Sequence, residues 1–363
     1  MRIGVLTGGG DAAGLNPAIR AVVIAADRAG STVIGLHDGW AGLLEGGQSR
    51  TLHASDLEGW LRAGGTLLGS SRTNPLALEG GIDEVLAQAT AHQLDALVAI
   101  GGDDTLSVAA ALSEHGFPVV GLPKTVDFDL AVTEYCIGFD SAVAIVAEAC
   151  DRLATTGASH HRTMVLEVMG RDTGWLAIMG ALAGGADLAV LPEFPMDLGA
   201  IVDHALARRA GGHGSSLILI AEGATIEGLE TLSDEGSTDA FGHVALARRA
   251  VGERLADALA GATGLDTRAT ALGHVQRGGP PAAADRIWPT RLGVAAVESL
   301  MAGTFGVCLG VVSAQPGPSR LAMWWPSRSE SPPSCTPPSG RSAEDYFPFT
   351  AEAIATVVLE VVE

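Results

Sequence analysis

One pattern constrains the fold of this chain more than any other feature. A short apolar run is followed by a glycine turn and then by an alanine-rich segment, and this order repeats along the chain. Residues 2–7 are typical of a strand, 8–11 (Gly-Gly-Gly-Asp) of a tight turn, and 17–29 of a helix. A second apolar run at 94–100 leads into a similar turn at 101–104 (Gly-Gly-Asp-Asp). Strands that alternate with helices in this way form mainly parallel sheets covered by helices, so we expect an α/β fold.

The same alternation continues along most of the chain. Further strands are predicted at 118–122, 163–169, 188–191, 217–221 and 268–272. Helices are predicted at 105–115, 141–155, 174–183, 244–260 and 291–301. A length of 363 residues suits one large α/β domain or two lobes, and we favour two.

The composition changes after Ser313. Seven prolines lie among serines and arginines there, which favours an irregular segment over 315–343, and the composition would fit a shifted reading frame. An apolar stretch at 351–362 indicates a final helix within 344–363, with no role suggested by its residues.

Charge and cysteine usage exclude several classes of function. A formal net charge of -20 argues against a nucleic-acid or anionic-membrane surface, so an anionic ligand must meet a local group of arginines. The four cysteines show neither metal-site spacing nor a disulfide framework, which fits a reducing cytoplasm. We expect no export signal and no transmembrane helix.

The chain has a single lysine, and it lies beside two carboxylates. Lys124, Thr125, Asp127 and Asp129 follow the strand expected at 118–122. Phosphoryl transfer needs a base, a metal-binding acid, a hydroxyl donor and a cation, and this loop holds all four. A solvated charged loop is the simpler alternative.

The two glycine turns favour phosphate, because backbone N–H groups at a helix N-terminus attract anions. A tight strand-to-helix turn is the alternative for 8–11, and acids in a first helical turn are commonly dipole partners. If both turns open at neighbouring strand ends, Asp103 could hold magnesium.

Four arginines lie in similar surroundings: Arg72, Arg162, Arg171 and Arg277. Each could be an ordinary surface ion-pair member, but neighbouring glycines would let a polyanion approach the guanidinium closely. His274, taken alone, is more typical of a hydrogen-bonded structural histidine.

Taken in order, these segments resemble the phosphofructokinase family. The resemblance rests on residues 8–11, 69–72, 101–103, 125–127, 138–140, 167–171, 221–223 and 273–279. It implies two similar three-layer α/β lobes with the active site in the cleft between them. We expect a donor-binding lobe at 1–138 plus about 277–305, and a sugar-phosphate lobe at 139–276 plus about 306–314.

The resemblance also implies residue roles. Asp127 would be the catalytic base for the 1-hydroxyl of fructose 6-phosphate, and Asp103 with Asp129 would bind Mg²⁺. Gly10 would contact the phosphoryl donor. The transferring group would be held by Arg72, Thr125 and Arg171, and the sugar phosphate by Met169, Gly170, Glu222, His274 and Arg277. Arg162 and Arg268 would bind the 6-phosphate in the site of a neighbouring subunit of a dimer or tetramer, so an isolated subunit should be inactive.

The donor is expected to be pyrophosphate. ATP-using relatives typically have glycine where this chain has Asp104, so a carboxylate would meet the α-phosphate and ribose of a nucleotide. Lys124 could stabilise the phosphate that departs from pyrophosphate. The combination of Asp104 and Lys124 resembles the pyrophosphate-dependent branch, whose reaction should run both ways.

Three alternatives stay open. An ATP-dependent phosphofructokinase is the first. A non-catalytic sugar-phosphate-binding homologue is the second, because Phe128 stands where the family usually has asparagine and the ending differs from the family's. A nicotinamide-dependent oxidoreductase is more remote, since its glycine spacing and acidic ribose ligand are both missing.

Overall fold

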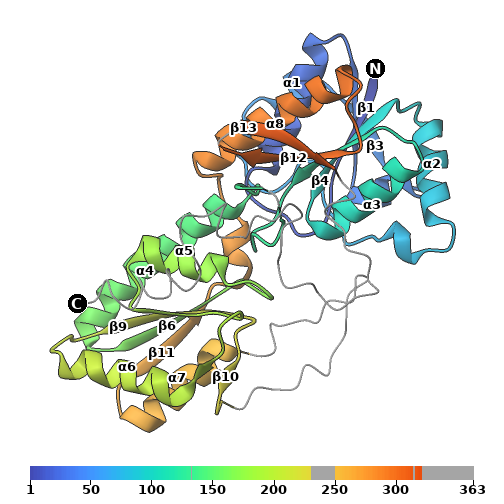
Figure 1. Ribbon diagram of the computed structural model, residues 1–363. Helices are drawn as coiled ribbons and strands as arrows, with labels where there is room; N and C mark the ends of the chain where they lie inside the picture. The colour runs from blue at the N-terminus through green and yellow to red at the C-terminus, as the bar shows by residue number, and fades with distance from the viewer. Residues whose placement is uncertain (132, 230–249, 314, 321–363) are drawn as a thin grey trace.

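A computed structural model describes residues 1–131, 133–229, 250–313 and 315–320, which form two α/β lobes (Figure 1). The first lobe is built on a sheet of seven strands in the order β13-β12-β5-β4-β1-β2-β3. Their bounds are β1 Arg2–Thr7, β2 Thr32–Leu36, β3 Ser49–Leu52, β4 Ala96–Gly101, β5 Val119–Pro123, β12 Val307–Val312 and β13 Gln315–Arg320. The inner strands are parallel, and β3 and β13 pair antiparallel at the two edges.

Helices cover both faces of this sheet, because alternate residues of its apolar strands point to opposite sides. Ile3 and Val5 of β1 belong to the core under α1 and α8, whereas Leu6 belongs to the core under α2 and α3. The helices are α1 Leu15–Arg28, α2 Gly81–Ala91, α3 Asp103–Glu114 and α8 Ala284–Met301. Short 3-10 helices lie at Gly39–Leu43, Ala54–Leu57, Trp60–Arg62 and Pro75–Ala77.

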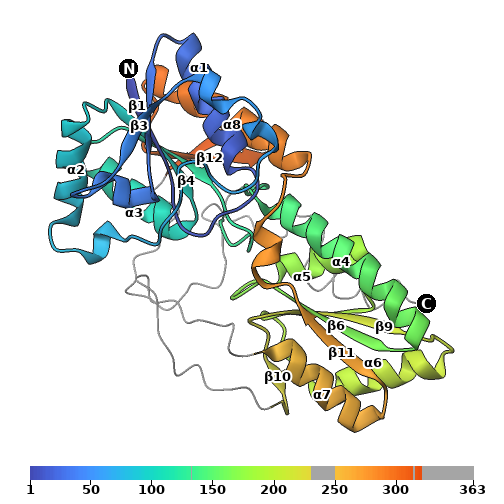
Figure 2. The same ribbon diagram turned by 180° about the vertical axis from the view of Figure 1, so that it is seen from behind.

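The second lobe has a parallel four-stranded sheet in the order β11-β6-β9-β7. Its strands are β6 Thr163–Val168, β7 Leu188–Val190, β9 Ser216–Ala221 and β11 Thr267–Ala271. One face carries α4 Phe139–His160 and α5 Trp175–Gly184, and the other carries α6 Leu198–Ala210 and α7 Val251–Thr263 (Figure 2). Two short strands, β8 Met196–Asp197 and β10 Ile226–Glu227, pair beside it. Both lobes therefore have three layers, as expected.

Several expectations are wrong. Residues 306–314 were assigned to the second lobe, but β12 pairs with β5 in the first sheet. The irregular segment expected from 315 begins with a strand, since Gln315–Arg320 pairs with β12. Its prolines, Pro316 and Pro318, are two residues apart, so both missing N–H groups fall on the same side of an edge strand and the other side still pairs. Residues 321–343 and the helix expected within 344–363 lie outside the described residues.

Other elements were not foreseen or began elsewhere. Sequence patterns missed the strands β2, β3, β8, β10 and β12 and the helices α2 and α6. The helix expected at 244–260 is α7, which begins at Val251, and residues 244–249 lie outside the described part of the chain. Within the described ranges, no helix combines the length and apolar character needed to cross a bilayer.

A buried carboxylate ties α8 to the start of α4, where the chain passes from the first sheet to the second. Asp285 is completely buried and accepts hydrogen bonds from the backbone N–H of Gly138 (2.7 Å) and of Ser141 (2.8 Å). The Ser141 hydroxyl (2.6 Å) and the Tyr135 hydroxyl donate to the same carboxylate. Burial raises the pKa of Asp285, while these hydrogen bonds lower it. Asp285 thus takes the place of a local N-cap for α4, whose capping residue is a glycine.

We expect Asp285→Asn to lower the free energy of unfolding by about 3 kcal/mol, because the amide NH₂ replaces one of the two carboxylate oxygens and faces two of the four hydrogen-bond donors. The measurement is denaturant unfolding followed by circular dichroism. Asp257→Asn, at an exposed position of α7, is the matched control and should change stability by less than about 0.5 kcal/mol. Equal midpoints for the two variants would contradict the capping role.

Candidate functional site

The two glycine turns meet at the carboxyl edge of the first sheet. The N–H of Gly8 donates to the carbonyl of Ile100 (3.0 Å), which joins the ends of β1 and β4. A Cβ added to Gly8, or to Gly101, would lie 2.4 Å from Oγ1 of Thr105. Glycine is needed at both positions because the buried Thr105 side chain packs between the turns. Sequence patterns missed this role of Thr105, and its place two residues after Asp103 offered no distinguishing signal.

The segment that carries Arg72 is bonded to the first glycine turn. The N–H of Gly9 donates to the carbonyl of Ser71 (3.0 Å), and Oγ of Ser70 donates to the carbonyl of Gly9 (2.5 Å). Arg72 itself is exposed and follows directly. The turn 8–11 is therefore bordered by an arginine-bearing loop from a distant part of the sequence.

Lys124 is buried under the first glycine turn. Its side chain is 3% exposed, and Nζ donates to the carbonyl of Gly10 (2.5 Å). Burial and then repulsion from Arg277 lower the pKa of Lys124 to about 8, against the attraction of Asp129 and Asp127. The ammonium thus reaches from the end of β5 toward the loop expected to bind the donor.

The loop after β5 holds Asp127 and Asp129 by hydrogen bonds from two threonines. Oγ1 of Thr125 donates to Oδ1 of Asp129 (2.8 Å) and accepts the N–H of Asp127 (3.1 Å). Oγ1 of Thr173, from the other lobe, donates to the carbonyl of Asp127 (2.6 Å). The half-buried Asp127 is therefore held at its backbone from both lobes, which is the geometry a positioned base requires.

The electrostatics around Asp127 combine opposing effects. Burial, followed by repulsion from Asp129, raises the pKa of Asp127, whereas Arg277, Arg171 and Lys124 lower it. A carboxyl group with a raised pKa is a stronger base once ionised than an exposed carboxylate, and such shifts are typical of catalytic groups.

The second lobe contributes Arg171 and Glu222 to the same region. Glu222 follows β9, and burial together with repulsion from Asp127 and Glu167 raises its pKa to about 6. Arg171 lowers the pKa of both Asp127 and Glu222, so its charge lies near both carboxylates. Around Gly170, which has φ of 140°, the chain turns tightly, and the N–H of Gly223 donates to its carbonyl (2.9 Å).

The 3-10 helix Gly273–Arg277 brings Arg277 across to the first lobe. Nη1 of Arg277 donates to the carbonyl of Asp11 (3.1 Å), and a Cβ on Gly10 would lie 2.7 Å from the same atom. The buried Gln276 side chain accepts the N–H of Met169 (3.2 Å) and donates to the carbonyl of Gly273 (3.0 Å). Gln276 was not among the expected site residues, although its motif was recognised, because its role depends on a contact with β6.

His274, in the same 3-10 helix, is exposed. It lies on the segment that carries Arg277, and its exposure leaves its side chain accessible to a ligand.

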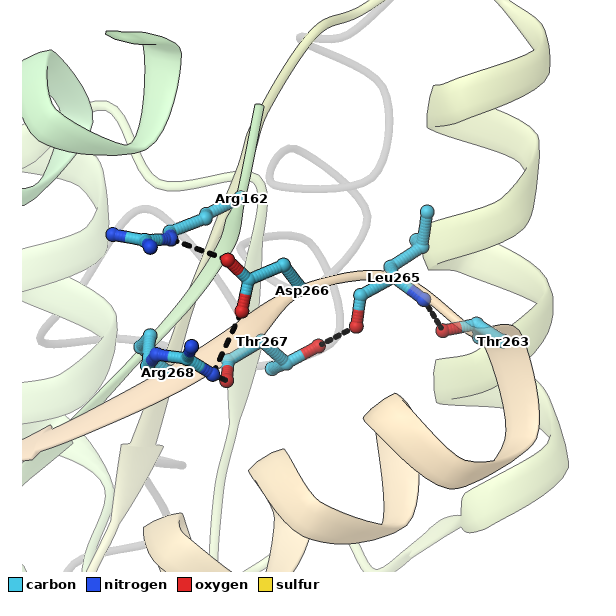
Figure 3. A network of polar contacts seen from close by, with 6 residues as sticks. All are labelled: Arg162, Thr263, Leu265, Asp266, Thr267 and Arg268. Carbon is cyan, nitrogen blue, oxygen red and sulfur yellow. Dashed lines mark hydrogen bonds and ion pairs between the residues drawn. The ribbon is translucent and has the colours of Figure 1, made fainter. Parts of the chain in front are cut away.

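Arg162 and Arg268 lie apart from these residues. They flank the amino ends of β6 and β11, whereas Met169 follows the carboxyl end of β6, roughly 20 Å along the strand. Asp266 lies between the two arginines, with its Oδ2 2.6 Å from Nε of Arg162 and its Oδ1 2.7 Å from Nη1 of Arg268 (Figure 3). Within one chain the structure therefore separates this pair from the other site residues.

The carboxylates expected to hold metal lie at neighbouring strand ends. Asp103 is the first residue of α3, directly after β4, and Asp129 lies in the loop after the adjacent β5. Both are exposed. In the described part of the chain, no three His, Cys, Asp or Glu side chains are grouped as a metal site. Two carboxylates fit Mg²⁺, which commonly takes one or two carboxylates and completes its shell with water and phosphate oxygens.

Two α/β lobes, a glycine-lined edge and facing basic and acidic side chains define a phosphate-handling enzyme site. The family model of phosphofructokinase matches residues 2–300, and the chain belongs to this family.

Curated relatives and solved structures agree with this assignment. The chain is 49% identical to "Pyrophosphate--fructose 6-phosphate 1-phosphotransferase" of Amycolatopsis methanolica, covering 86% of this chain and 90% of the relative. It is 44% identical to an "ATP-dependent 6-phosphofructokinase" of Corynebacterium efficiens, with 86% and 90% covered. The phosphofructokinase structure from Pichia pastoris matches with a TM-score of 0.77 and 31% identity, covering 89% of this chain and 35% of that one. The chain therefore spans about a third of that longer protein.

The lone lysine allows its pKa to be measured directly. Protein labelled with ¹³C-lysine should give one side-chain Cε signal that titrates with a midpoint of about 8, because burial and Arg277 disfavour the ammonium. The charge is present below that pH and is lost above it. Arg277→Gln should raise the midpoint, and Arg291→Gln on α8 is the control. A midpoint near 10.5, the ordinary lysine value, would contradict the buried environment.

Proposed function

We propose that this protein transfers a phosphoryl group from pyrophosphate to the 1-hydroxyl of fructose 6-phosphate, forming fructose 1,6-bisphosphate and phosphate in a reversible reaction. One observation carries the choice of donor: the buried ammonium of Lys124 lies under the glycine turn, hydrogen-bonded to Gly10. The relative from Amycolatopsis methanolica, which bears a pyrophosphate-dependent name, supports the same choice.

In this mechanism Asp127 accepts the proton of the 1-hydroxyl as that oxygen attacks the terminal phosphorus of pyrophosphate. The bond from that phosphorus to the bridging oxygen breaks, and inorganic phosphate leaves with the electron pair. Lys124 stabilises the charge on the departing phosphate. Arg72, Thr125 and Arg171 hold the transferring group, while Gly10 offers backbone to the donor.

Asp103 and Asp129 would hold Mg²⁺, which neutralises phosphate charge when bound. The sugar phosphate would be held by Met169, Gly170, Glu222, His274 and Arg277. We place the reaction in the cytoplasm.

Asp104 would exclude nucleotides. It lies in the first turn of α3, next to Asp103, where the polyphosphate of a longer donor would continue. A carboxylate at this point repels further phosphate and occupies the space a glycine would leave.

The purified protein should use pyrophosphate in preference to ATP in a coupled assay with fructose 6-phosphate and Mg²⁺. Asp104→Gly should raise kcat/KM for ATP by about tenfold or more, because it removes both the charge and the bulk. Asp83→Gly, in the first turn of α2, is a matched acid-to-glycine control and should leave the donor ratio unchanged. Preference of the unmodified protein for ATP would defeat the donor proposal in favour of an ATP-dependent phosphofructokinase. Binding of fructose 6-phosphate without turnover under either donor would support a non-catalytic homologue.

We further propose a dimer or tetramer in which Arg162 and Arg268 contact the 6-phosphate bound to a neighbouring subunit. The separation of this pair from the remaining site residues within one chain supports the arrangement.

Subunit mixing tests the shared site. Asp127→Asn should lower kcat by about 10²- to 10⁴-fold, and Arg162→Ala should be similarly inactive. When the two inactive variants are denatured and refolded together, a hybrid holds one site with an intact Asp127 from one subunit and an intact Arg162 from the other, so activity should return. Co-refolding Asp127→Asn with Asp129→Ala is the control. Each of these variants lacks an acid of its own loop, and a neighbouring subunit supplies only Arg162 and Arg268, so no site in the mixture is complete and activity should stay low. No recovery in the first mixture would place Arg162 in its own subunit's site.

A further inference from the structure

The backbone of Phe128, between the two loop acids, has an unfavourable conformation. Its φ is 55°, in the left-handed region that a bulky residue enters only at an energetic cost. Such a residue persists when surrounding contacts hold it, and residues of this kind gather at functional sites. The ring of Phe128 makes contacts of this kind.

The Phe128 ring packs at the junction of the two lobes. Its centroid is 4.6 Å from that of Phe139, the first residue of α4, and 6.3 Å in edge geometry from that of Trp175, the first residue of α5. Phe128 also packs against the first-lobe core that includes Leu130 and against the second-lobe core that includes Val126. The ring therefore contacts the hydrophobic cores of both lobes.

Polar contacts act on the residues either side of the ring. The carbonyl of Asp127 accepts a hydrogen bond from Thr173, two residues before Trp175, and the carboxylate of Asp129 accepts one from Thr125. These bonds hold the backbone of Asp127 and the carboxylate of Asp129. The contacts of the ring hold the residue that joins the two acids.

We propose that Phe128 is a positioning residue, whose ring holds Asp127 and Asp129 in place and couples them to the packing of the two lobes. This proposal rests on the proposed function. The resemblance to the family implies asparagine at this position. Asparagine enters the left-handed region readily but has no ring to pack. In this chain the packing of the Phe128 ring stabilises the left-handed conformation that asparagine would adopt by its own backbone preference.

The opposite interpretation is that Phe128 impairs the site by displacing a polar side chain. Phe128→Asn distinguishes the two interpretations, because it introduces a residue that readily adopts the left-handed conformation and removes the ring. If the ring positions the acids, kcat falls by about tenfold or more with KM for fructose 6-phosphate changed by less than about twofold. If the ring impairs the site, kcat stays the same or rises, and the proposal is overturned.

Two further variants control for packing alone. Phe128→Tyr keeps the ring and should retain kcat within about twofold. Phe117→Leu removes a ring that packs against the same first-lobe core, away from the loop. It should lower the melting temperature without lowering kcat. A loss of kcat in Phe117→Leu equal to that in Phe128→Asn would reduce the effect to general destabilisation and overturn the positioning role.

A readout independent of turnover separates this proposal from the proposed function. The fluorescence of Trp175 is isolated by subtracting the emission spectrum of a Trp175→Phe variant from that of the same protein with Trp175 present. This is done for the unmodified protein and for Phe128→Asn. Phe128→Asn should shift that emission to longer wavelength, because water replaces the ring at its edge. Inactivity of the unmodified protein toward both donors would defeat the proposed function alone. Unchanged Trp175 emission in Phe128→Asn would contradict only the proposed packing role of the Phe128 ring.

Discussion

The parallel run of β1, β4 and β5 is the constraint on which the site depends. Parallel neighbours end at one edge of a sheet, so the chain leaves that edge three times and each departure brings a loop to the same place. The buried Thr105 packs between two of these loops, and no side chain larger than hydrogen fits at Gly8 or Gly101 beside it. The N-terminus of α3, where an anion is favoured, lies at the same edge.

Buried charge gives the site its chemical character. Lys124 is buried and Asp127 is half-buried, and in each case burial is the largest influence on the pKa. Each group also lies within the field of the other, which offsets part of that cost, whereas Arg277 favours the Asp127 carboxylate and opposes the Lys124 ammonium. A phosphate arriving between them would meet charges that are already oriented, which is how preorganised sites stabilise developing charge.

The two lobes contact each other through residues that are distant in sequence. Asp285 of α8 caps α4, the Thr173 hydroxyl reaches the carbonyl of Asp127, and Arg277 reaches the first glycine turn. Phe128 adds an apolar contact with both cores. The Thr173 and Phe128 contacts act directly on the loop after β5, so relative movement of the lobes would alter that loop.

The sequence alone determined the three-layer α/β class, the strands β1, β4 and β5 of the first sheet, all four strands of the second sheet, and the family, because apolar runs and glycine turns are local patterns. It also placed Lys124, Asp127 and Asp129 in one loop, since neighbours in sequence are neighbours in space. Four strands of the first sheet, β2, β3, β12 and β13, were not predicted and are identified by their pairing. The prolines of β13 argued against a strand there.

Tertiary structure decided what depends on contacts between distant segments. It assigned β12 to the first sheet, gave Gln276 a partner in Met169 and buried Lys124 beneath Gly10. It also placed the Phe128 ring between two cores. The physical reason is that burial and hydrogen bonding across the fold arise only when segments far apart in the chain are packed together, and no local pattern records which of them will meet.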